Sequence, residues 1–239
     1  MSVLRTARNP VRFMPEKSRN NAPLRVIVAL CLAVALAASS SLNAAAESAD
    51  AVVDRLQRNY DSTTDFVADF RQETEVKTLN RSLKASGKLS YKRPGKMLWR
   101  YEMPKDQFVL TDGKFLYFYQ SEENQIIKSP LKNAFRTDIP LSFLLGLGNL
   151  KKDFNATLKA TEENQNVLRL VSKGDPGGYS DIQMGVSKKT GDIVWVSVRD
   201  GAGNLTTLSF SEMRKGVGVK DALFQLQIPD GADIVELGQ

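Results

Sequence analysis

Apolar and polar residues alternate along most of the chain after residue 60, and this pattern predicts β-strands. The clearest stretch runs from Tyr91 to Tyr119. It contains two turn signals, Lys92-Arg93-Pro94-Gly95 and Asp112-Gly113, because proline fixes φ and glycine admits turn conformations. The segments predicted as strands around these turns are 96–101, 107–111 and 114–119.

These strands place aromatic side chains on a shared surface. On segment 96–101, Met97, Trp99 and Tyr101 lie on one face, opposite Lys96 and Arg100. Segment 114–119 is apolar on both of its faces, and a strand of that kind is covered on both faces. The stretch therefore predicts a curved, aromatic-rich surface that is filled either by side chains or by a ligand.

Two segments have helical spacing instead. In segment 48–60 the apolar residues fall on one stripe, which predicts a helix packed on a sheet; they are Val52, Val53, Leu56 and Tyr60. Segment 137–146 begins with a possible cap at Thr137 or Asp138 and has Pro140 in its first turn. Its residues are apolar on nearly every side, so this short element is either buried or covers something apolar.

The rest of the chain predicts further strands separated by turn residues. They are expected at 63–76, 84–91, 125–128, 158–161, 167–172, 180–186, 193–198 and 205–210, with a last strand in 224–235 that ends in the turn at Pro229–Gly231. Short strands at such spacing indicate a mainly β fold with few helices, built on one antiparallel sheet of meander type, as a barrel or half-barrel. Residues 47–239 are predicted to form a single domain.

Residues 1–46 have the pattern of a signal peptide. Six basic residues precede an apolar run from Val26 to Ala38, and Ala44-Ala45-Ala46 offers a cleavage site. Thirteen apolar residues are too few for a comfortable membrane span. Cys31, the only cysteine, lies within the apolar run, so the mature chain is expected to have no disulfide. We predict a cleaved leader and a soluble protein of the bacterial periplasm.

Removing this leader changes the charge balance. The whole chain has 33 basic and 27 acidic residues, a formal net charge of +6, but residues 1–46 hold six of the basic residues and one of the acidic ones. The mature chain therefore has 27 basic and 26 acidic residues, a net charge of +1. Nucleic-acid binding through bulk charge is not supported.

The composition also argues against several kinds of enzyme. The chain has no histidine, which removes the commonest general base and the commonest zinc ligand. No complete phosphate-binding glycine loop occurs, and Ser129-Pro-Leu-Lys132 matches a Ser-Lys spacing only loosely. We expect no enzyme activity, no cofactor and no metal site.

Several segments together carry a family resemblance. They are Asp65–Gln72, Gly87–Pro94, Met97–Tyr101 with Pro104, Leu110–Lys114 with Leu116 and Tyr119, Pro140–Gly146 and Phe224–Pro229. In their order, their spacing and the leader before them, the chain resembles the outer-membrane lipoprotein carrier (LolA) family over essentially its whole mature length.

The resemblance implies an incomplete antiparallel β-barrel covered by a helical lid. It also implies a monomeric periplasmic chaperone that takes acylated lipoproteins from an inner-membrane ABC exporter and delivers them to an outer-membrane receptor. Arg93 corresponds to the family's arginine that bonds lid carbonyls and holds the empty form closed. The lid would contain Leu141, Phe143, Leu144 and Leu145. The acyl-chain cavity would be lined by Phe66, Phe70, Leu89, Met97, Trp99, Tyr101, Phe108 and Tyr117.

Two alternatives stay open at this point. One is a protein of the same fold that binds another lipid or senses mislocalised lipoproteins. The other is a structural or interaction domain whose apolar face is filled by its own side chains. The size of the cavity separates these two classes, and a hydrolase without histidine is a more distant third.

Overall fold

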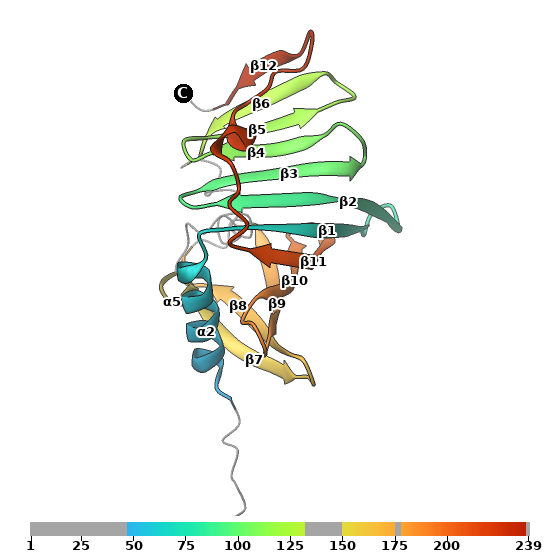
Figure 1. The fold of residues 1–239 in the computed structure, drawn as a ribbon. Helices are drawn as coiled ribbons and strands as arrows, with labels where there is room; N and C mark the ends of the chain where they lie inside the picture. The colour runs from blue at the N-terminus through green and yellow to red at the C-terminus, as the bar shows by residue number, and fades with distance from the viewer. Residues whose placement is uncertain (1–46, 132–149, 175–177, 238–239) are drawn as a thin grey trace, which may run out of the picture. The chain divides into compact units, whose positions relative to one another are not determined.

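A computed structural model describes residues 47–131, 150–174 and 178–237 of the chain (Figure 1). Twelve strands form one open sheet in the order β12-β6-β5-β4-β3-β2-β1-β11-β10-β9-β8-β7. The strands β1 to β6 are Asp65–Val76, Arg81–Lys92, Lys96–Met103, Phe108–Asp112, Phe115–Gln120 and Gln125–Pro130. The strands β7 to β12 are Phe154–Thr161, Gln165–Ser172, Tyr179–Ser187, Ile193–Asp200, Leu205–Lys215 and Asp233–Glu236.

The topology confirms the predicted incomplete barrel. Neighbouring strands are antiparallel except for β12 and β6, which run parallel at one edge. Strands β1 and β11 join the two halves of the sheet, since Phe70 lies opposite Phe210. The edges β12 and β7 are not paired with each other, so the sheet does not close.

Helices are few in the described residues. The helix α2 spans Ala49–Ser62, as its apolar stripe predicted, and the hydroxyl of Ser48 accepts a hydrogen bond from the Ala51 amide at 3.2 Å. The short helix α5 spans Leu150–Asp153, and the 3₁₀ helix η1 spans Asp221–Phe224. The predicted helix at 137–146 lies outside the described residues.

Two apolar clusters pack on the two faces of the sheet. We call the face that carries α2 the inner face; its cluster includes Leu56 from α2 together with Phe70 and Trp99 from the strands. The other, outer face carries a second cluster, which includes Leu98, Leu110, Tyr117, Ile126 and Phe224. On β1, β3, β4 and β5, alternating residues supply the two clusters.

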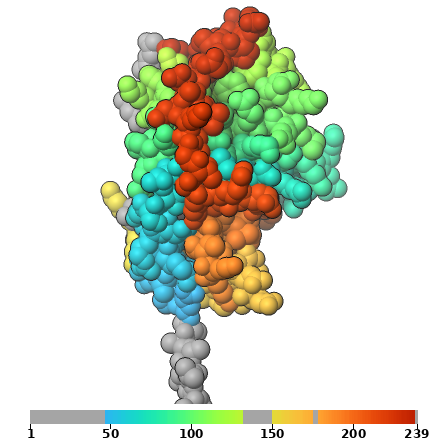
Figure 2. All heavy atoms as spheres, in the orientation of Figure 1, coloured from blue at the N-terminus to red at the C-terminus, as the bar shows by residue number. Residues whose placement is uncertain are grey.

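The C-terminal segment covers the outer face. After β11 the chain crosses strands of the first half of the sheet and reaches β6, and Figure 2 shows this segment as a red band over the green strands. Phe224 of η1 is 2% exposed within the outer cluster. Asp221 accepts hydrogen bonds from the ammonium groups of Lys92, at 3.1 Å, and Lys96, at 2.7 Å.

The prediction placed the last strand on the wrong side of the turn near the end of the chain. A strand was expected before the turn at Pro229–Gly231, but the strand β12 follows this turn. The residues before the turn extend over the outer face, where Leu226 packs on the outer cluster instead of pairing in a ladder.

Candidate functional site

The inner face of the sheet is lined with aromatic residues that contact one another. The ring of Phe70 lies edge-on to Trp99, with centroids 4.7 Å apart, and to Tyr101 at 5.1 Å. The indole of Trp99 also lies 6.0 Å from the ring of Phe210 and donates a 2.7 Å hydrogen bond to the sulfur of Met97. Aromatic rings and a thioether make an apolar surface that can adapt to different shapes.

The helix α2 covers part of this surface. Val52, Val53 and Leu56 are at most 1% exposed, and all three belong to the inner cluster. Near the end of the helix, the ring of Tyr60 lies 5.8 Å from that of Tyr91. Burial and the neighbouring Tyr91 raise the pKa of Tyr60, so its hydroxyl stays protonated.

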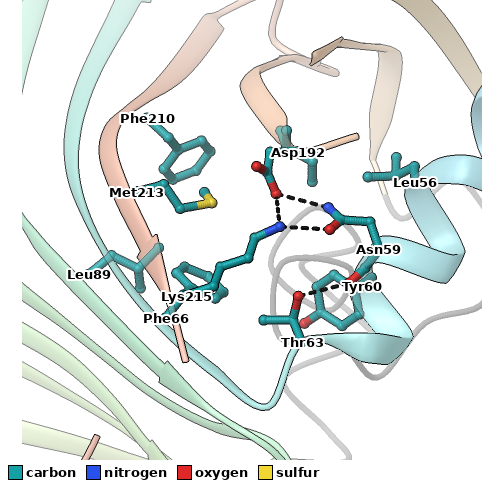
Figure 3. A pocket seen from close by; sticks show the side chains of 11 residues that line it. Leu56, Asn59, Tyr60, Thr63, Phe66, Leu89, Asp192, Phe210, Met213 and Lys215 are labelled. Carbon is teal, nitrogen blue, oxygen red and sulfur yellow. Dashed lines mark hydrogen bonds and ion pairs between the residues drawn. The ribbon is translucent and has the colours of Figure 1, made fainter. Parts of the chain in front are cut away.

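A small apolar pocket remains between the last turns of α2 and the sheet (Figure 3). Its lining residues come from α2, the following Thr63, the strands β1, β2, β10 and β11 and the turn before β10: Leu56, Asn59, Tyr60, Thr63, Phe66, Leu89, Asp192, Ile193, Phe210, Met213 and Lys215. Its free volume is about 40 Å³, which is room for a few water molecules at most. A long acyl chain is larger than this free volume.

A polar cluster lies at one side of this pocket. Lys215 on β11 makes an ion pair with Asp192, and Asn59 of α2 bonds to both groups, as the dashed lines in Figure 3 show. Burial raises the pKa of the Asp192 carboxyl, but hydrogen bonds from Lys215, Thr190 and Asn59 outweigh burial and hold that pKa below its ordinary value.

Arg93 binds the end of α2 from the turn between β2 and β3. Its guanidinium donates a 2.6 Å hydrogen bond to the backbone carbonyl of Asp61 and lies 3.5 Å from the Asp61 carboxylate. The last carbonyls of a helix have no partner within the helix, and a cation is favourable there. The Arg93 side chain is 41% exposed, so this contact can break without burying a charge.

Comparison with known proteins shows the family. Residues 61–227 match the family described as "Outer membrane lipoprotein carrier protein LolA". The chain belongs to this family.

Individual relatives agree with the assignment. The chain is 32% identical over 216 residues to a protein of Cupriavidus pinatubonensis named outer-membrane lipoprotein carrier protein, covering 89% of this chain and 98% of the relative. A protein of the same name from Cupriavidus necator is 31% identical over the same length and with the same coverage. In fold alone, the chain is similar to an uncharacterised conserved protein of Thermus thermophilus, with a TM-score of 0.53 and 13% identity over 79% of this chain and 99% of that one.

Six of the residues predicted to line the acyl-chain cavity do lie together on the inner face. They are Phe66, Phe70, Leu89, Met97, Trp99 and Tyr101, the last of them only partly buried. Phe66 and Leu89 line the small pocket described above. Phe70, Met97, Trp99 and Tyr101 lie in the aromatic surface beside this pocket and do not line it.

The structure does not bring Phe108 and Tyr117 to this face. Both belong to the outer cluster, because Phe108 lies opposite Arg100 and Tyr117 lies opposite Leu110 in the antiparallel register. Residues directly opposite in such a pair point to the same face. The inner face of β4 and β5 carries Val109 and Leu116 instead.

Sequence reasoning missed the residues at the end of β11. Strict alternation from Phe210 would place residues 212 and 214 on the inner face, but a β-bulge with Glu212 at a φ of 51° shifts the pattern by one residue. Met213 and Lys215 line the pocket as a result. Asn59 and Asp192 carried no signal, since a single polar residue in a helix or a turn is ordinarily solvated.

The remaining points concern the predicted lid, a metal site and a membrane-spanning helix. The lid residues Leu141, Phe143, Leu144 and Leu145 lie outside the described residues. Within 47–131, 150–174 and 178–237, no three acidic, cysteine or histidine side chains are grouped to hold a metal ion. In the same part of the chain, no helix is both long and apolar enough to cross a membrane.

Proposed function

We propose that this chain is a periplasmic carrier that shields the acyl chains of lipoproteins and delivers them to the outer membrane. Its membership of the lipoprotein carrier family is the observation that supports this most directly. The proposal includes a leader cleaved after residue 46, a single monomeric domain over 47–239, and no enzyme activity or nucleic-acid binding.

The physical need for a carrier is large. Each methylene group exposed to water costs about 0.8 kcal/mol, so a protein with several acyl chains does not cross an aqueous compartment unaided. The inner face offers an apolar surface of six residues that would receive these chains: Phe66, Phe70, Leu89, Met97, Trp99 and Tyr101. The pocket beside α2 is too small for them, so this proposal requires α2 to move when cargo is loaded.

Arg93 has the role of a latch in this proposal. Its bond to the Asp61 carbonyl holds the end of α2 near the sheet. Loading breaks this bond, so part of the energy gained by burying acyl chains is offset, and cargo is held loosely enough to be released. An inner-membrane ABC exporter would supply the cargo, an outer-membrane receptor would take it, and the segment with Leu141, Phe143, Leu144 and Leu145 would complete the lid.

The test is release of a purified lipoprotein from proteoliposomes that contain the cognate exporter. We expect the wild-type protein to release lipoprotein as a soluble one-to-one complex and to pass it on to receptor-bearing vesicles. Arg93→Leu is expected to load equally well and to unload more slowly, because closing no longer competes with the cargo.

Arg71→Leu is the matched control, since Arg71 is an exposed arginine on β1. It should load and unload like the wild type. Failure of the folded wild-type protein to release lipoprotein would overturn the carrier proposal and favour a lipid sensor or a scaffold. Equal unloading by Arg93→Leu and the wild type would overturn the latch alone.

A further inference from the structure

We propose that Asn59, Asp192 and Lys215 form a second latch, which holds the end of α2 independently of Arg93. In this role Asn59 is a positioning residue: it sets how often α2 moves away from the inner face. The inference rests on the proposed function, because it concerns access to the same apolar surface.

The two contacts hold the end of α2 from different parts of the sheet. Asp61 is bound by Arg93 from the turn between β2 and β3. Asn59, two residues earlier in the same helix, is bound from the turn between β9 and β10 and from the end of β11. Breaking one contact leaves the other in place, so full displacement of the helix requires that both break.

The amide of Asn59 is well matched to its partners. Its nitrogen donates to the Gly191 carbonyl at 3.0 Å and to the Asp192 carboxylate at 2.8 Å, and its oxygen accepts from the Lys215 ammonium at 2.6 Å. Gly191 has a φ of +71°, and a Cβ there would lie 3.2 Å from the Arg55 side chain, so a glycine lets this turn approach the helix.

The second latch is less exposed than the first. The side chains of Asp192 and Lys215 are 18% and 31% exposed, whereas Arg93 and Asp61 are 41% and 60% exposed. Hydrogen bonds to charged groups are stronger where water competes less. The Asn59 contact should therefore hold the helix at least as firmly as the Arg93 contact.

Release of this latch leaves no isolated charge beside the pocket. When α2 moves away, Asn59 loses its bonds, but Lys215 and Asp192 stay paired on the sheet. A neutral amide enters water and finds new partners there, so the cost of release is the net value of its hydrogen bonds and includes no cost for exposing an unpaired charge. This property suits a contact that must break and form again in each cycle.

The other end of α2 is anchored differently. Glu47 makes an ion pair with Arg55. It also accepts a 2.7 Å hydrogen bond from Asn166 on β8, and Asn166 is fully buried. Val52 and Val53 are buried against the inner cluster as well. These contacts hold the N-terminal half of α2 on the inner face, so we expect the Asn59 contact to act on the C-terminal half, within the range that the two-residue connection to β1 allows.

Distance measurement between two spin labels tests this movement without any cargo. The labels go on the mature protein from residue 47 onward, in which no cysteine remains after the leader is cleaved, at Arg58→Cys on α2 and Glu122→Cys between β5 and β6; both sites are exposed. We expect Asn59→Ala to raise the ratio of open to closed molecules about tenfold or more, the effect of losing hydrogen bonds to charged groups.

Two further variants keep the test decisive. Lys215→Met, which removes one partner of Asn59, should open the helix in the same direction. Ser62→Ala removes a 2.9 Å bond to the Asn59 carbonyl within the helix, and it should leave the distances unchanged. Asn59→Ala combined with Arg93→Leu should open α2 further than either change alone.

Unchanged distances in Asn59→Ala, with Arg93 present and with Arg93→Leu, would overturn the second latch. Opening of the helix in Ser62→Ala to the same extent would also overturn it, since the effect would then be general weakening of the helix end. The carrier proposal fails separately: it requires lipoprotein release from membranes, whereas these distances are measured in the absence of lipoprotein.

Discussion

The substitution Gly87→Ala should be among the most damaging small changes on the inner face. Gly87 on β2 lies between Phe70 on β1 and Tyr101 on β3 in the strand register. A Cβ atom at this position would lie 2.1 Å from the backbone oxygen of Arg100 and 2.9 Å from the Cα atom of Tyr101. Both are backbone atoms, so no side-chain rotation relieves the overlap.

The expected loss of stability in Gly87→Ala follows from how close the added Cβ atom comes to the backbone of β3. Ordinary contacts of a Cβ atom begin near 3.4 Å, so β2 and β3 must separate by more than an ångström at a register shift that already interrupts their ladder. Overpacking of this kind costs about 3 kcal/mol. For a domain of this size, about 3 kcal/mol corresponds to a decrease in Tm of about 6–12 °C.

Chemical and thermal denaturation followed by circular dichroism measure this loss. Gly174→Ala is the matched control, because a Cβ atom there would meet nothing within 4 Å. The control should stay within about 0.5 kcal/mol of the wild type. If Gly87→Ala lost less than about 1 kcal/mol, the close approach of β2 and β3 described here would be refuted.

Three other predictions address the two faces and the polar cluster. Leu116→Gln on the inner face should weaken binding of a fluorescent fatty acid, whereas Phe108→Gln on the outer face should not; equal losses would contradict the assignment of faces. Because the pKa of Asp192 is lowered in the folded state, its stabilising effect is present above its ordinary pKa of about 3.8 and is lost as pH falls through the lower folded value. Asp192→Asn should therefore flatten the stability curve below about pH 4 in acid titrations of unfolding. Phe224→Ala should cost about 3–5 kcal/mol and raise hydrogen exchange in β12, and protection of β12 at the wild-type level would count against its role as the anchor of the C-terminal segment.

The strands were predictable where one face is polar. On β3, Lys96 and Arg100 oriented the alternation, so the inner-face positions of Met97, Trp99 and Tyr101 followed from the sequence. On β5 both faces are apolar, and alternation alone does not say which face is inner. The pairing of Tyr117 with Leu110 is what assigns Tyr117 to the outer face. For lack of this information, the predicted cavity included Phe108 and Tyr117, which belong to the outer face.

The polar cluster was beyond sequence reasoning for a different reason. Asn59 and Lys215 are 156 positions apart and meet only because β1 pairs with β11 and the last turns of α2 lie beside both strands at the pocket. The bulge at Glu212 then decides which side Lys215 faces. No local pattern specifies a contact of that range.

The pairing of β1 with β11 also has a consequence for how the chain matures. Phe66 meets Lys215, so the two halves of the sheet join only after residue 215 has been synthesised. Until then β1 has an open edge, and β6 lacks its neighbour β12 until residues 233–236 have been synthesised. Long-range strand pairing is slow, and unpaired edges are prone to aggregation. The nascent chain therefore passes through a stage in which its own apolar faces need protection from water, as its proposed cargo does later.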